Sequence, residues 1–79
     1  MRQSIEDTIF ALLAEREPGK TICPSEAARA LDGAAWRRLM PPVRATAVEL
    51  ARQGRLVITR KGRPADPDAF KGVYRLRLP

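Results

Sequence analysis

The stretch "RLVITRKGRPADPDAFKGVYRLRLP" (residues 55–79) decides which fold the rest of the chain has to complete. Residues 55–60 and 73–78 alternate apolar and polar side chains, which predicts two β-strands that each bury one face. Glycine and proline keep the connection, residues 61–72, irregular, with one helical turn expected in "DPDAF" (residues 66–70). The stretch therefore predicts a hairpin, and a hairpin of two strands needs helices packed against it to be stable.

Two helices and a brief strand are predicted upstream of this hairpin. Residues 4–17 form the first helix, because Ser4 is a favourable N-cap and apolar side chains then recur every three or four residues. The residues "KTIC" (20–23) predict a short strand that can pair with the hairpin. A second helix begins at Pro24, since proline suits the first helical position, and residues 32–33 then turn the chain.

The third helix contains two residues that oppose helix formation. Apolar side chains keep helical spacing across residues 36–50. However, Pro41 and Pro42 each lack a backbone donor and disfavour helical geometry in the residue before them. We therefore expect a short helical segment over residues 34–39, a break, and then a main helix that begins at Pro41 or Pro42 and runs to Gln53.

This order of elements predicts an α+β fold of the winged helix-turn-helix type: helix, short strand, helix, helix and a two-stranded wing. The second and third helices would form the helix-turn-helix pair, and the hairpin would be the wing. At this length we expect residues 1–79 to form a single domain.

Four stretches support this fold by resemblance. They are "TICPSEAARAL" (21–31), "WRRLMPPVR" (36–44), "ARQGRL" (51–56) and "KGRPADP" (61–67). Together they resemble a family of small bacterial winged-helix domains whose function is not established, and the resemblance spans nearly the whole chain. It implies the fold and no activity, because a shared fold does not by itself transfer a function.

The composition argues against an enzyme. The chain has no histidine and one cysteine, Cys23, so neither the usual zinc ligand sets nor a Ser-His or Cys-His pair can be assembled. We expect no catalytic residue, no metal and no cofactor, and a buried, unreactive Cys23. A lone cysteine, no long apolar run and no secretory signal core predict a cytoplasmic protein without a membrane partner.

The charge of the chain is unevenly distributed and points to an anionic partner. The net charge is +6, with −2 in residues 1–17 and +5 in residues 54–79. A basic end of this kind attracts polyanions. The predicted nucleic-acid-binding residues lie before the third helix, on its outer face and at the hairpin. They are Arg37, Arg38, Arg44, Arg52, Arg60, Lys61 and Arg63.

Two functions follow from this pattern. The first is a nucleic-acid-binding module, for double-stranded DNA, with weak sequence specificity, because the outer face of the third helix also carries Ala45, Val48 and Glu49 and no asparagine that could recognise adenine. The alternative is a protein–protein interaction module, or a homodimerising winged helix, that binds no nucleic acid. In that case the apolar outer positions or the acidic first helix would contact the partner.

Overall fold

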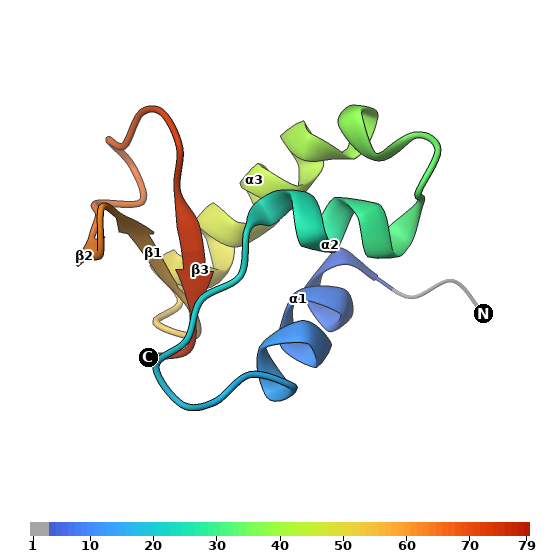
Figure 1. Cartoon of the computed structure of the whole chain (residues 1–79). Helices are drawn as coiled ribbons and strands as arrows, with labels where there is room; N and C mark the ends of the chain where they lie inside the picture. Colours follow the sequence, from blue (N-terminus) through green and yellow to red (C-terminus); the bar gives the residue numbers. More distant parts are fainter. Residues whose placement is uncertain (1–3) are drawn as a thin grey trace.

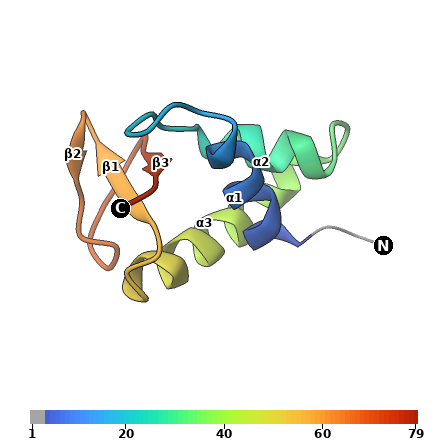
Figure 2. The same ribbon diagram turned by 90° about the horizontal axis from the view of Figure 1, so that it is seen from below.

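Three helices precede a small antiparallel sheet in the computed structural model, which describes residues 4–79 (Figure 1). The helices pack beside one another, and the sheet covers one end of them (Figures 1 and 2). The elements are α1 (Ile5–Ala14), α2 (Pro24–Leu31), α3 (Trp36–Arg52), β1 (Val57–Arg60), β2 (Arg63–Pro64) and β3 (Arg75–Arg77).

The sheet has the strand order β2-β1-β3. β1 and β3 pair antiparallel, with Ile58 opposite Leu76, as the alternating pattern predicts. The strand predicted over residues 20–23 is reduced to a single bridge in which Ile22 and Leu76 exchange two backbone hydrogen bonds of 2.8 and 2.9 Å. The fold is therefore the predicted α+β winged helix-turn-helix, with α2 and α3 as the helix pair and the segment from β1 to β3 as the wing.

The connection between the two long strands is more regular than predicted. β2 lies within it and pairs with β1, Arg60 opposite Arg63. Lys61 and Gly62 join the two strands with backbone φ angles of 52° and 81°, and a two-residue turn with both φ angles positive matches the right-handed twist of its strands. The turn predicted in "DPDAF" is present, with the Ala69 N–H donating to the Asp66 carbonyl at 3.1 Å.

The first two helices begin where the sequence predicts. The Ser4 hydroxyl caps α1 by accepting the N–H of Asp7 at 3.0 Å. Pro24 is the first residue of α2, and the Glu26 carboxylate accepts the N–H of the N-cap residue Cys23 at 2.6 Å. α1 ends earlier than expected, because the N–H groups after Ala14 bond to carbonyls three residues back and tighten the last turn.

The predicted break in the third helix is wrong. α3 runs without interruption from Trp36 to Arg52, with Pro41 and Pro42 inside it. The two prolines leave the carbonyls of residues 37 and 38 without their helical donors, but both of those residues are exposed and water can bond to them. On the opposite face Val43, Ala47 and Leu50 are buried. Tertiary packing therefore outweighs local propensity here.

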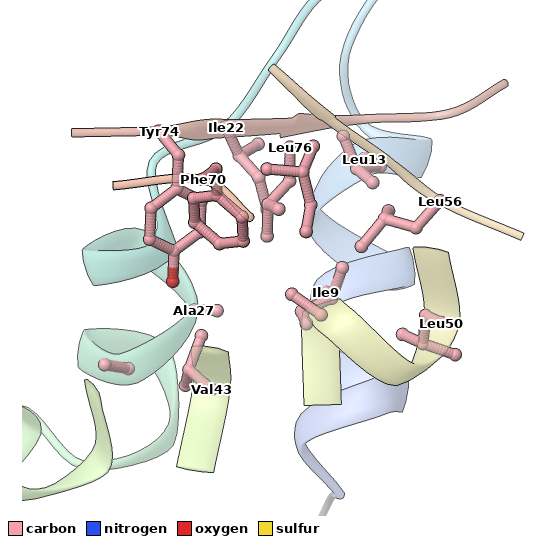
Figure 3. Packing of buried hydrophobic residues seen from close by; sticks show 13 residues of the cluster. Ile9, Leu13, Ile22, Ala27, Val43, Leu50, Leu56, Phe70, Tyr74 and Leu76 are labelled. Atoms are coloured by element: carbon pink, nitrogen blue, oxygen red, sulfur yellow. The ribbon is translucent and has the colours of Figure 1, made fainter. Parts of the chain in front are cut away.

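The core lies where the three helices meet the sheet (Figure 3). Ile9 of α1 lies toward Leu50 of α3, and Leu76 covers this part of the core from the sheet. Phe70 and Tyr74, from the wing, form an edge-to-face pair with ring centroids 5.0 Å apart. This pair fixes the connection between β2 and β3 against the helices.

Candidate nucleic-acid interface

Three of the seven predicted cations hold the wing loop, residues 66–74, against the rest of the domain. We call Arg44, Arg52 and Arg60 the loop arginines. Arg44, on α3, is half-buried and donates to the Phe70 carbonyl at 3.1 Å, and its guanidinium lies 3.9 Å from the centre of the Phe70 ring. The charged guanidinium of Arg44 therefore already interacts with Phe70 of the same chain.

The other two loop arginines bind the same segment. Arg52 donates from Nε to the Asp68 carboxylate at 2.7 Å and also pairs with Glu49. The hydrogen bond and the charge of Asp68 raise the pKa of Arg52. Arg60 donates to the Val73 carbonyl at 2.9 Å. Their partners lie 13 to 16 residues away along the chain, so sequence spacing could not have identified them.

Arg37 and Arg38 lie at the beginning of α3, beside the turn from α2. The Arg37 guanidinium stacks 4.5 Å from the centre of the Trp36 ring, whereas the side chain of Arg38 is exposed and makes no ion pair or hydrogen bond within residues 4–79. Arg29, on α2, stacks on the same ring at 4.3 Å. We call Arg29, Arg37 and Arg38 the turn arginines. Arg29 is not among the predicted residues, because only the packing of α2 against α3 brings it to this ring.

Lys61 lies in the turn between β1 and β2, and Arg63 directly follows this turn; we call these two residues the hairpin pair. Both are exposed, and neither makes an ion pair or side-chain hydrogen bond with any residue whose structure is described. The hairpin and the α2–α3 turn lie at opposite ends of the domain in both views (Figures 1 and 2). The seven predicted residues therefore form two separate basic ends joined by the loop arginines, and not one continuous patch.

The outer face of α3 between these ends carries little that could recognise a base. Pro41, Ala45 and Glu49 are exposed. Val48, which was expected on the outer face, is half-buried and packs against the core. Because Arg52 is held by Asp68, the face presents no free donor pair of the kind that distinguishes bases in the major groove.

A hollow of about 400 Å³ opens between the start of α2, α3 and the end of the wing loop. Met40, Val73 and Tyr74 give it a largely apolar lining, and Val73 is 84% exposed at its edge. The Tyr74 hydroxyl is buried and has no hydrogen-bond partner among residues 4–79. Burial raises the pKa of Tyr74 above the usual tyrosine value, although the charge of Arg44 lowers it in part.

Cys23 also lines this hollow and is half-buried, not fully buried as expected. Its sulfur lies 2.6 Å from a guanidinium nitrogen of Arg75. Within residues 4–79, no three histidine, cysteine, aspartate or glutamate side chains are placed to hold a metal ion together. The helices of the same region include none with the length and apolarity needed to cross a membrane.

The fold and the two basic ends define a small winged-helix domain. The chain belongs to the family described as "Protein of unknown function (DUF3253)", whose model matches residues 2–79. A comparison with curated proteins found no match. The function therefore has to be argued from the residues themselves.

Proposed function

We propose that this domain is a non-enzymatic module that binds double-stranded DNA through its phosphates, with weak sequence specificity. The observation that carries the proposal is that four of the seven predicted residues, at the two ends of the domain, are exposed and have no acidic partner in the described part of the chain. They are Arg37, Arg38, Lys61 and Arg63. Flexible cations of this kind neutralise phosphates and release counterions.

The position of the two basic ends favours a duplex over an isolated anion. The domain measures 32 Å along its longest axis, and the ends lie far apart (Figure 2). One turn of B-DNA spans about 34 Å, and its major groove is about 12 Å wide. The turn arginines and the hairpin pair can therefore contact phosphates about one helical turn apart on the same duplex.

The loop arginines have a supporting role in this proposal. Arg44 and Arg52 fix the wing loop to α3, and Arg60 fixes it to β1. A wing that is held in one position loses less conformational freedom when it meets a phosphate backbone, which favours binding. Weak specificity follows from the outer face of α3, which carries proline, alanine and glutamate at its exposed positions.

The test is binding of a fluorescently labelled 20-base-pair duplex of random sequence, measured by anisotropy at low salt. Replacing Lys61 and Arg63 with alanine should weaken binding about equally for every sequence, by roughly tenfold for two lost phosphate contacts. A charge-matched control replaces Lys20 and Arg77, which lie beside the α1–α2 loop and the C-terminus, and should keep the affinity of the unmodified protein.

Two results would contradict the proposal. No binding of the duplex at low salt would exclude the module function. Tighter binding of a duplex RNA of the same sequence would exclude DNA as the target.

Protein recognition is a second candidate, and it is favoured by the exposed Val73 beside the apolar hollow. Exposed apolar side chains around a hollow are typical of protein contacts. Light scattering after size-exclusion chromatography tests the homodimer form of this candidate. A dimer that Val73→Ser converts to a monomer would favour it over DNA binding, whereas a monomer at high concentration would count against it.

A further inference from the structure

Two arginines from different helices stack on one indole at the α2–α3 turn. The guanidinium carbons of Arg29 and Arg37 lie 4.3 and 4.5 Å from the centre of the Trp36 ring. The two charges can therefore be no farther apart than the sum of these distances. Like charges this close repel each other, and a bound anion would relieve the repulsion.

No carboxylate near the turn is placed to neutralise this pair. Within residues 4–79, neither Arg29 nor Arg37 has an ion pair, and the first turn of α3 contains no acidic residue. Glu26, on α2, already binds Arg16 and the Cys23 N–H. Asp32 lies between the two helices. Its Oδ1 already accepts the N–H groups of residues 34 and 35, both at 3.0 Å. The two guanidinium groups therefore have unused hydrogen-bonding capacity.

Stacking leaves that capacity available to a ligand. A guanidinium that lies on an aromatic ring uses its flat face, while its five N–H donors point outward in the plane of the group. The indole thus limits the positions of both groups without occupying a single donor. Phosphate oxygens are suitable acceptors, because arginine binds them through paired, charge-assisted hydrogen bonds.

We propose that Arg29, Trp36 and Arg37 form a phosphodiester-binding site in which both guanidinium groups donate to one phosphate or to two neighbouring phosphates of a duplex. The inference rests on the proposed DNA-binding function and extends it. It adds Arg29 as a binding residue and gives Trp36 the role of positioning the two arginines. It also makes the α2–α3 turn, and not the hairpin, the end of the domain that contributes more to affinity.

The test uses Trp36, the single tryptophan of the chain, as an intrinsic probe. Titration of the full chain with an unlabelled 20-base-pair random duplex should change its tryptophan emission, because binding moves the guanidinium groups relative to the ring. Arg29→Gln should weaken binding of a labelled copy of this duplex about tenfold. Arg29→Lys should recover only part of the affinity, because an ammonium keeps the charge and loses the planar fork.

The control is Arg63→Gln at the other end of the domain, which should weaken binding less and leave the emission change intact. A circular dichroism melt checks that Arg29→Gln, at an exposed position, remains folded. If the unmodified protein binds the duplex but Arg29→Gln binds equally well with unchanged emission, this inference is overturned while DNA binding stands. If the unmodified protein binds no duplex, the proposed function fails as well.

Discussion

The wing loop and the α2–α3 turn both concentrate arginine, but they use it differently. Arg44 and Arg60 donate to backbone carbonyls of the loop at about 3 Å, so their donors stabilise the fold. Arg29 and Arg37 lie against the face of an indole and keep their donors free. The number of cations in a segment therefore does not locate an interface. What matters is whether each guanidinium already has an acceptor within the chain.

The largest effect that this comparison predicts is a loss of stability at Arg44. Arg44→Leu removes a charge-assisted hydrogen bond to Phe70 and the contact with its ring, which should lower the free energy of unfolding by about 2 kcal/mol. Urea denaturation measures it. Arg38→Leu, at an exposed position, is the matched control and should leave the midpoint unchanged. Equal urea midpoints for the two variants would mean that the contacts of Arg44 with Phe70 do not stabilise the fold.

A smaller loss is expected at Gly72, where the loop contacts Arg60. Gly72 has a φ angle of 84°, and the Cβ of an alanine there would lie 2.5 Å from the Arg60 guanidinium. Gly72→Ala should therefore cost about 1–2 kcal/mol, from backbone strain and from displacement of Arg60.

Two other glycines separate the causes of the Gly72 effect. Gly54→Ala has a similar φ angle of 75° and open space around the new Cβ, whereas Gly33→Ala has open space and no positive φ angle. The loss should decrease from Gly72 to Gly54 to Gly33. If Gly72→Ala costs no more than Gly54→Ala, Arg60 does not hold the loop.

Removing the hydroxyl of Tyr74, at the boundary between the wing and the helices, should make the fold more stable. Its hydroxyl is buried without a partner in the described region, and such a group costs about 1–3 kcal/mol. Tyr74→Phe should therefore raise the free energy of unfolding by about 1 kcal/mol, measured by thermal denaturation at neutral pH. An unchanged or lower melting temperature would show that the hydroxyl has found an acceptor.

The same tyrosine makes the stability of the fold depend on pH. Burial raises its pKa in the folded state above the ordinary value of 10.0, so the unfolded chain loses this proton at a lower pH than the folded one. The contribution of the protonated Tyr74 to stability is therefore complete below pH 10. It is lost as the pH rises through the pKa of Tyr74 in the folded state. Absorbance at 295 nm follows this tyrosine, which is the only one in the chain. Tyr74→Phe should show a smaller loss of stability above pH 10.

The smallest effect on stability is predicted at Lys61. Its φ angle of 52° lies in the left-handed region, which asparagine adopts more readily, and Asn-Gly is the preferred pair for such a turn. Lys61→Asn should stabilise the fold by a few tenths of a kcal/mol while weakening duplex binding severalfold through the lost charge. Stability and affinity that fall together would mean that the hairpin pair acts through the fold.

The starts of α1 and α2 and the main strand pairing could be predicted because they depend on local patterns. Ser4 and Pro24 act within three residues of their own positions. The alternation in residues 55–60 and 73–78 fixes which side chains are buried, and so the pairing of β1 with β3. Local spacing contains this information without any knowledge of the tertiary structure.

The errors concern interactions that join distant parts of the chain. α3 passes through Pro41 and Pro42 because its other face is buried against α1 and the sheet. Arg44 bonds to a carbonyl 26 residues away, so its acceptor could not be inferred from spacing. The candidate interface was predicted from charge and from the expected fold. Neither could separate Arg37, Lys61 and Arg63 from the loop arginines or place Arg29 beside Trp36.

The most direct test of the DNA-binding proposal is the salt dependence of duplex binding. Four exposed cations that each neutralise a phosphate give a slope of log K against log salt of about −3.6. We expect this slope for the unmodified protein. The slope should be shallower by about 2 when Lys61 and Arg63 are replaced by alanine. An affinity that does not change between 50 and 200 mM salt, or the absence of any binding at the lower concentration, would contradict it.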